Sequence, residues 1–245
     1  MSTIIVPLFD PKTQIQLKQN IGIFGPRKSG KTHIAAQICR DLEAQHRNIR
    51  FIVVGKRVDI ELYPESAIIL TKWDEYEIKE LFETHQKMWK HIDGLELYFV
   101  LEDVSPVQYR KSRMLNKIME NGWSNHCTFI CVHKDVQRIP YVMASNLDWV
   151  ICSHYPISID QQAIFHEFFH SELSRHDFQK LYRKITAELW FKESKHQFLV
   201  TNLTDEIPVY HYYKCPLIKK QTSKSKTKPE TVTKDSKEHF EVQIV

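Results

Sequence analysis

The stretch that decides the fold is GPRKSGKT, residues 25–32, which follows the apolar run IGIF and precedes a segment with helical periodicity. Gly25, Gly30, Lys31 and Thr32 satisfy the pattern G-x-x-x-x-G-K-[ST] in the required context of a strand and then a helix. The two glycines let the backbone approach phosphate closely, so that N–H groups and the N-terminus of the next helix point at anionic oxygens. The pattern therefore predicts a phosphate-binding loop.

The residues of this loop have expected roles in binding ATP and Mg²⁺. Lys31 would neutralise the β- and γ-phosphates, while the Thr32 hydroxyl would ligate Mg²⁺. The predicted nucleotide-binding residues are Gly25, Pro26, Arg27, Lys28, Ser29, Gly30, Lys31 and Thr32. A surface turn that contains Gly-Lys-Thr by chance is the alternative interpretation of the same letters.

A second motif, LYFVLEDV at residues 97–104, is an apolar run that ends in two carboxylates, Glu102 and Asp103. We expect this run to be a strand lying beside the strand of the phosphate loop. At its carboxyl end one acid can hold the Mg²⁺ shell, and the next can polarise an attacking water. Glu102, Asp103 and Lys31 are therefore predicted catalytic residues, with Thr32 and Glu102 as predicted metal ligands. An acidic turn that only caps the strand is the alternative.

Short β-rich runs alternate with helical patterns along most of the chain. The runs are continuously apolar, as is typical of parallel strands covered on both faces. Expected strands cover residues 21–24, 51–54, 67–70, 97–101, 128–132 and 149–152. Expected helices cover residues 31–45, 74–91, 112–121, 158–171 and 174–188, and residues 187–202 are expected to form a hairpin at the sheet edge. This alternation predicts an α/β fold with a mostly parallel central sheet flanked by helices.

Length and charge limit the possible organisation. The 245 residues, 42% of them hydrophobic, predict one domain over residues 1–213 and a disordered Lys/Ser/Thr-rich tail over residues 214–245. The net charge of +4 comes from that tail, because residues 1–213 hold 26 basic and 26 acidic side chains. The composition of the domain therefore argues neither for nor against nucleic-acid binding. No apolar run approaches the ~20 residues of a membrane span, so we expect an intracellular protein that is not secreted.

Taken together, the motifs resemble the FtsK/HerA superfamily of packaging ATPases of large DNA viruses and virophages. The resemblance covers roughly residues 20–155 and rests on the phosphate loop, the acid pair, MLNKIMENGWSNHCTFICVHK and IPYVMASNLDWVIC. It implies a RecA-like P-loop NTPase of the ASCE type that hydrolyses ATP to move double-stranded DNA into a capsid. It also implies a homo-oligomeric ring, contact with capsid proteins, and a location in the cytoplasmic virus factory of an infected host or in the virion.

Further positions follow from the resemblance. Asn121-Gly122 matches the turn that follows the acids in that family, and the segment 139–148 matches the one before the last core strand. His133 falls at a polar sensor position that is usually Gln, and a His there can still donate or accept toward the γ-phosphate or water. His133 is therefore a further predicted catalytic residue.

The chain also departs from the family pattern. The family favours Asp-Asp or Asp-Glu, so the order Glu102-Asp103 leaves open which acid holds Mg²⁺ and which acts on water. Two family arginines are replaced by Asn125 and Ala144. An arginine finger would have to come from elsewhere, and the candidates Arg110, Arg113 and Arg138 also fit solvated surface residues.

Three other interpretations compete with the motor. HEFFH at residues 166–170 matches the H-E-x-x-H zinc signature, with Glu188 as a third ligand, but the chain holds 13 His, which makes a chance match common. Phe165, Phe168 and Phe169 instead indicate a helix packed in the core. A nucleotide-binding scaffold without turnover and a P-loop nucleotide or small-molecule kinase both remain open, although a kinase would need an arginine-rich lid.

Overall fold

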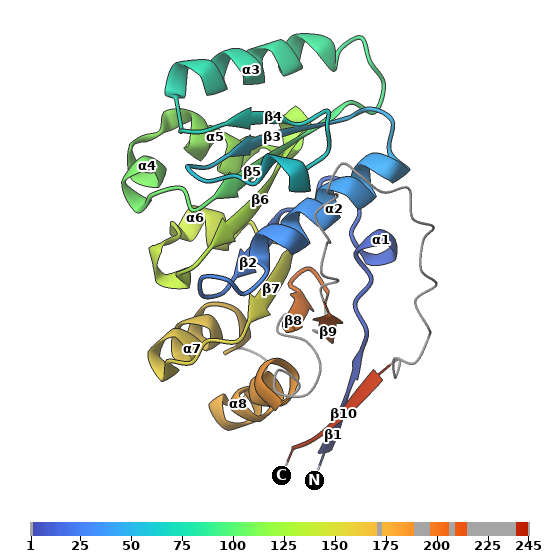
Figure 1. Cartoon of the computed structure of the whole chain (residues 1–245), viewed down its shortest axis with the longest axis vertical. Coiled ribbons are helices and arrows are strands. Elements are labelled where there is room, and N and C mark those ends of the chain that lie inside the picture. The colour runs from blue at the N-terminus through green and yellow to red at the C-terminus, as the bar shows by residue number, and fades with distance from the viewer. Residues whose placement is uncertain (1, 171–172, 189–196, 206–208, 215–238, 245) are drawn as a thin grey trace, which may run out of the picture.

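The structure, a computed structural model, describes residues 2–170, 173–188, 197–205, 209–214 and 239–244. Its central sheet has eight strands in the order β4-β3-β5-β6-β2-β7-β8-β9 (Figure 1). The strands are β2 (Ile21–Phe24), β3 (Ile49–Val54), β4 (Ile68–Leu70), β5 (Glu96–Glu102), β6 (Cys127–His133), β7 (Trp149–Ser153), β8 (Gln197–Asn202) and β9 (Tyr210–Lys214). β2 to β7 pair in parallel, and β8 and β9 add antiparallel strands at one edge. The predicted mostly parallel α/β sheet is confirmed.

Helices cover both faces of this sheet. One face packs against α2 (Lys31–Gln45) and the short turn η1 (Ile60–Leu62), and α1 (Pro11–Gln14) contacts α2. The other face packs against α3 (Glu75–Met88), α4 (Pro106–Lys111), α5 (Arg113–Asn121), α6 (Tyr141–Ala144), α7 (Ser158–Ile164), η4 (Phe165–Phe169), α8 (Arg175–Arg183) and η5 (Lys184–Glu188). Among the described residues no helix combines the length and hydrophobicity that crossing a membrane requires.

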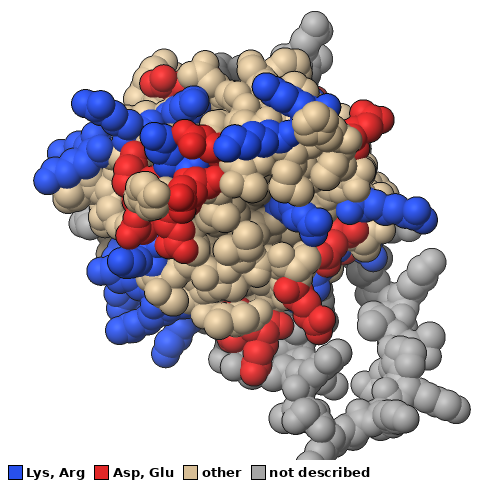
Figure 2. All heavy atoms as spheres, turned by 90° about the horizontal axis from the view of Figure 1, so that it is seen from above, with Lys and Arg blue, Asp and Glu red and all other residues tan. Residues whose placement is uncertain are grey.

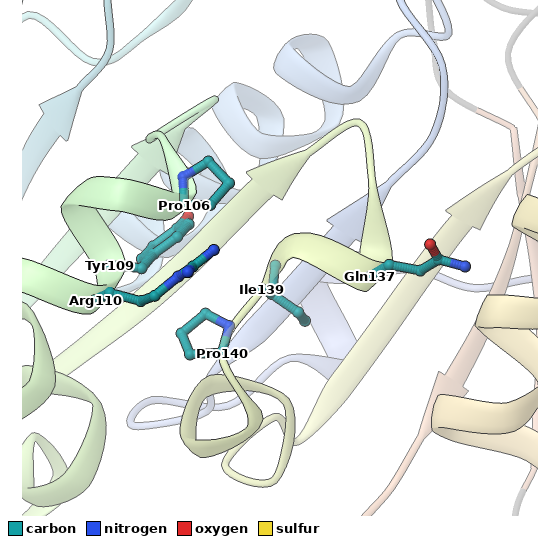
Figure 3. A pocket seen from close by; sticks show the side chains of 6 residues that line it. All are labelled: Pro106, Tyr109, Arg110, Gln137, Ile139 and Pro140. Carbon is teal, nitrogen blue, oxygen red and sulfur yellow. The ribbon is translucent and has the colours of Figure 1, made fainter.

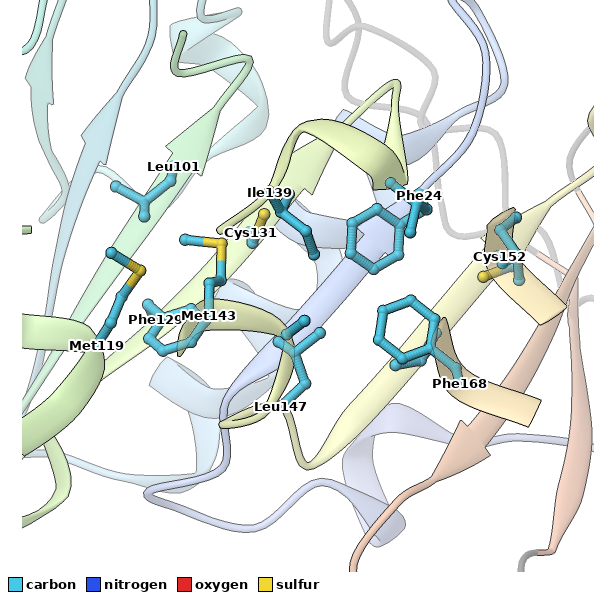
Figure 4. Close-up of a cluster of buried hydrophobic side chains, with 14 of the residues drawn as sticks. Phe24, Leu101, Met119, Phe129, Cys131, Ile139, Met143, Leu147, Cys152 and Phe168 are labelled. Atoms are coloured by element: carbon cyan, nitrogen blue, oxygen red, sulfur yellow. The ribbon is translucent and has the colours of Figure 1, made fainter. Parts of the chain in front are cut away.

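Alternate residues of the central strands enter two separate hydrophobic clusters. In β5, Phe99 and Leu101 belong to one cluster, whereas Tyr98 and Val100 belong to the other. All four side chains are buried, and burial of each such apolar side chain contributes roughly 1.5–3 kcal/mol. Figure 4 shows the first cluster, in which Leu101 lies among side chains from β6, α5 and α6. A strand buried on both faces is therefore apolar throughout, which is why these strands could be found in the sequence.

The order of the strands differs from one expectation. β5 does not lie beside β2, because β6 is inserted between them: Phe24 pairs with His133, and Glu102 pairs with Val132. Crossover connections between parallel strands can skip a neighbour, so the sequence order of strands did not determine their order in the sheet.

The expected hairpin is also formed by other residues. Residues 184–188 continue the helical region as η5, and β8 pairs with β9 rather than with a partner inside residues 187–202. Residues 189–196 lie outside the described part of the chain. The pair β8–β9 does extend the sheet beyond β7, as expected of an edge addition.

The two ends of the described chain form a small sheet of their own. β10 (His239–Ile244) pairs antiparallel with β1 (Ser2–Pro7), at the lower end of Figure 1. Residues 239–244 belong to the tail that was predicted to be disordered, so this short strand differs from the expectation. Its apolar residues alternate with polar ones, which is a strand pattern that the lysine-rich composition of the tail concealed. Residues 215–238 lie outside the described part.

Candidate active site

The phosphate loop connects the carboxyl end of β2 to the start of α2. Gly30 is the N-cap residue of α2 and has φ of 93°, in the left-handed region that favours glycine. Gly25 is required for a different reason, because a Cβ there would lie 2.1 Å from Ser153 Oγ and 2.8 Å from Ser29 Oγ. The geometry therefore accounts for both glycines of the motif.

Lys31 lies close to the acid pair. Its amine donates to the Pro26 carbonyl at 2.8 Å, so the side chain curls back over its own loop. Burial lowers the pKa of Lys31, whereas the charges of Asp103 and Glu102 act in the opposite direction. The phosphate loop and the acid pair, which the sequence singled out separately, are thus brought together at one edge of the sheet.

Glu102 is buried at the centre of the site and is 8% exposed. The Tyr63 hydroxyl donates to Glu102 Oε1 at 2.5 Å, and the Thr32 hydroxyl also hydrogen-bonds to this carboxylate. Burial raises the pKa of Glu102, and the two hydrogen bonds partly oppose that rise. The two predicted metal ligands, Thr32 and Glu102, therefore meet.

Asp103 differs from its neighbour in both exposure and backbone. It is exposed, and its φ of 49° places it in the left-handed region, which Asp tolerates better than most residues. Its N–H donates to the Val132 carbonyl of β6 at 3.0 Å. This turn leaves Glu102 inside and Asp103 at the surface of the site, so the two acids have different environments.

His133 ends β6 between the two motifs, at the predicted sensor position. The ring is buried, and its Nδ1 lies 2.8 Å from the Asp135 carbonyl and 3.1 Å from the Asp135 amide. The ring also bonds to the backbone of Val104, beside the acid turn. Burial lowers the pKa of His133, so the neutral ring is favoured. These contacts describe a residue that positions the acid turn, and the predicted catalytic role of His133 stays a prediction.

A pocket of about 260 Å³ opens over the phosphate loop. It is lined by Lys28, Ser29, Gly30, Lys31, Thr32, His33, Arg57, Asp59 and Leu62. Arg57, Asp59 and Tyr63 were not predicted from the sequence. All three follow β3, which pairs with β5, so their place beside the acids depends on a strand order that the sequence did not reveal.

The donor set fits ATP with Mg²⁺. A buried carboxylate bonded to a threonine hydroxyl supplies oxygen ligands, which Mg²⁺ prefers, and the Lys31 amine supplies a cation for phosphate. Ser29 lines the pocket, and its hydroxyl is buried without a hydrogen-bond partner in the described part of the chain. A phosphate oxygen would give this hydroxyl an acceptor.

Of the arginine candidates, Arg110 and Arg113 do not line the pocket over the phosphate loop. Arg110 lines a second pocket of about 440 Å³ between α4 and the segment 137–140 that precedes α6 (Figure 3). This pocket shares no lining residue with the pocket over the phosphate loop. Arg113 is exposed at the start of α5. Arg138 ends the short turn η3 (Val136–Arg138), and its side chain is outside what the structure describes.

The residues of the zinc signature are also accounted for. His166 and His170 are exposed, whereas Phe165, Phe168 and Phe169 are buried, as predicted for a helix packed in the core. Among the described residues no group of three His, Cys, Asp or Glu is placed to hold a metal ion. The side chain of Glu188 is not among them.

The segment 139–148 leads into β7, as the resemblance implies. Asp148 lies at the amino end of β7, and its Oδ2 accepts from the Asn20 amide at 2.6 Å. Because β2 and β7 are parallel, this is the edge of the sheet opposite the phosphate loop. The segment therefore anchors strands rather than contributing to the site.

The parallel sheet and the positions of the two motifs at its edge define the fold as that of a P-loop NTPase. Among solved structures, the chain is similar to the genome packaging NTPase B204 of Sulfolobus turreted icosahedral virus 2 in complex with AMPPCP, with a TM-score of 0.59, 12% identity, and coverage of 83% of this chain and 100% of that one. It is also similar to the pCW3 conjugation coupling protein TcpA with ATPγS (TM-score 0.53, 16% identity, 85% of this chain, 64% of that one). A third similar structure is EssC, ATPases 2 and 3, from Geobacillus thermodenitrificans (TM-score 0.54, 15% identity, 80% of this chain, 39% of that one).

These likenesses confirm the fold that the FtsK/HerA resemblance implied. No protein-family model matches the chain, and no curated protein sequence does so either. At 10–16% identity the shared property is the architecture, and the activity has to be argued from the site.

The hydrogen bond from Tyr63 provides a test of the acid's environment. Because this bond lowers the pKa of Glu102, Tyr63→Phe is expected to raise that pKa further. If hydrolysis needs the ionised carboxylate, the acidic limb of the pH–rate profile shifts to higher pH, while the rate at alkaline pH changes little. Tyr98→Phe is the matched control, since that hydroxyl accepts from the Lys18 amide instead. An unchanged acidic limb in Tyr63→Phe would show that Glu102 does not control it.

Proposed function

We propose that this chain binds ATP with Mg²⁺ and hydrolyses it. The observation that carries the proposal is the contact between the Thr32 hydroxyl and the Glu102 carboxylate, beside the amine of Lys31. Mg²⁺, when bound, would neutralise phosphate charge as a Lewis acid. Thr32 and Glu102 would hold it, and Lys31 would exchange the Pro26 carbonyl for phosphate oxygens.

The two acids would divide the work. Glu102 is the better metal ligand, because it is buried and already bonded to Thr32. Asp103 is exposed next to it and would orient and deprotonate the attacking water. His133, through its bond to the Val104 backbone, would keep the acid turn in place.

We further propose that hydrolysis drives double-stranded DNA into a capsid. The sequence resemblance supports this, together with similarity to B204, which is named a DNA-packaging ATPase in the turreted icosahedral virus. The chain would act as a homo-oligomeric ring in which a neighbour's arginine reaches the phosphates, with capsid proteins as partners, in the infected cell or the virion. Figure 2 shows Lys and Arg interspersed with Asp and Glu on the face seen there, so that face offers no continuous basic surface for DNA.

DNA dependence of ATP hydrolysis tests the motor. At low salt, double-stranded DNA is expected to stimulate hydrolysis independently of its sequence, because contacts to the phosphate backbone carry no sequence information. The stimulation should weaken steeply as salt rises from about 50 to 200 mM. Phosphate release measured with two unrelated duplexes checks this result. Steady hydrolysis without a response to DNA would contradict the motor, and binding without hydrolysis would favour a scaffold.

A further inference from the structure

The turn that follows β3 lies against the acid pair. Gly55 begins this turn, and its amide donates to the Leu70 carbonyl of β4 at 3.0 Å. A Cβ on Gly55 would lie 2.9 Å from Glu102 Cβ and 3.0 Å from the Glu102 carbonyl oxygen. The absence of a side chain therefore lets the turn pack directly on the residue that we assign to Mg²⁺. The position of the turn is fixed relative to the acids.

Arg57 projects from this turn into the pocket over the phosphate loop. It lines that pocket together with Lys28 and Thr32. The side chain is exposed, and no hydrogen bond or ion pair engages it among the residues that the structure describes. An arginine on a protein surface is commonly solvated, but Lys56, which precedes it, is also exposed and does not line the pocket.

We propose that Arg57 binds the terminal phosphate of the nucleotide held by its own subunit. The inference rests on the proposed function and adds a residue to it. A guanidinium offers up to two parallel N–H bonds to phosphate oxygens, and it stays charged at every working pH. Because the turn packs on Glu102, Arg57 approaches from the acid side of the loop, where the γ-phosphate has to lie for Asp103 to direct water at it. The family's missing arginines would be replaced, in part, from within the same chain.

Nucleotide affinities distinguish this role from general attraction. With Arg57→Ala, the affinity for ATPγS is expected to fall about 10- to 100-fold, as for loss of a charge-assisted hydrogen bond. The affinity for ADP should change less than about threefold, since ADP lacks the phosphate concerned. Arg57→Lys should recover part of the ATPγS affinity. Lys56→Ala is the control, with the same loss of charge one residue away and no expected effect on either nucleotide.

Two results would overturn the proposal. An equal loss for ATPγS and ADP would mean that Arg57 attracts nucleotides without contacting the terminal phosphate, and no loss would mean that it is solvated. Lys31→Ala separates this failure from that of the proposed function: if Lys31→Ala weakens ATPγS binding and Arg57→Ala does not, only the assignment of Arg57 fails. If neither weakens it, the nucleotide site itself is wrong.

Mixing two variants, each with an impaired nucleotide site, tests whether Arg57 acts within its own subunit. Arg57→Ala subunits retain Lys31, and Lys31→Ala subunits retain Arg57. If Arg57 served the neighbouring subunit's nucleotide, mixed assemblies would contain complete sites and hydrolysis would return. The proposal expects no recovery at any mixing ratio, and recovery would overturn the assignment within one subunit.

Discussion

Lys31→Ala is expected to reduce ATP hydrolysis by at least about 10²–10³-fold while leaving the fold intact, by analogy with the loss of one preorganised charge-stabilising donor. The amine is the cation that the phosphate loop places beside the acids, and its bond to the Pro26 carbonyl shows that it reaches across the loop. Burial lowers the pKa of Lys31, because the charged amine is less well solvated there than in water. The charge therefore does not stabilise the nucleotide-free protein. Removing it should therefore not lower the melting temperature appreciably.

Steady-state phosphate release, together with circular dichroism and a melting curve, measures both parts of this expectation. Lys87→Ala is the matched control, because Lys87 is an exposed lysine of α3 that belongs to neither pocket. Turnover that survives in a folded Lys31→Ala protein would contradict the assignment of the phosphate loop. The melting curve shows whether the variant is folded, so a loss of turnover caused by unfolding can be recognised.

The amide variants of the two acids are expected to separate binding from hydrolysis. Glu102→Gln should abolish turnover and weaken the dependence of nucleotide binding on Mg²⁺, because an amide is a poorer magnesium ligand than a carboxylate. Asp103→Asn should retain Mg²⁺-dependent binding and lose about 10²–10⁴-fold in rate, the usual contribution of a general base. Binding of ATPγS across a magnesium titration, alongside phosphate release, measures the difference. Retained turnover in both variants would remove the acids from the mechanism.

Glu102→Gln is also expected to change the thermal stability of the protein. Burial raises the pKa of Glu102 in the folded state. The contribution of Glu102 to the free energy of unfolding is therefore fully present below its unfolded-state pKa, and it is lost as pH rises through its folded-state pKa. At pH 8 without nucleotide, the neutral amide should therefore raise the melting temperature, with each ~1 kcal/mol appearing as about 2–4 °C in a chain of this size. The difference from the unsubstituted protein should shrink at pH 4. An unchanged melting temperature at pH 8 would argue that the carboxylate is well solvated.

Much of the fold could be predicted because its central strands are buried on both faces. β5 and β6 each contain a continuous apolar run, residues 97–101 and 129–132, which marks them without knowledge of their neighbours. The order of the strands could not be predicted in this way, because it depends on which crossovers skip a neighbour. β10 was missed because its six residues follow a long polar, lysine-rich stretch that dominates any compositional window.

The residues of the candidate site likewise differ in whether the sequence alone could identify them. Lys31, Thr32 and Glu102 could be predicted as candidate site residues because each belongs to a contiguous motif with a known chemical purpose. Tyr63 and Arg57 belong to no motif, and they reach the site only because β3 pairs with β5. Their local sequence carries no sign of that role, and an arginine in a polar turn is ordinary on any protein surface.

Because β6 lies between β2 and β5, it contacts both the phosphate loop and the acid turn. The Gly25 amide donates to the His133 carbonyl at 3.3 Å, while the Asp103 amide donates to the Val132 carbonyl at 3.0 Å. Two successive carbonyl groups of β6 thus bind the start of the phosphate loop on one side and the acid turn on the other. A displacement of the phosphate loop would therefore act on the acid turn through these two adjacent peptide groups, and a displacement of the acid turn would act on the loop in the same way.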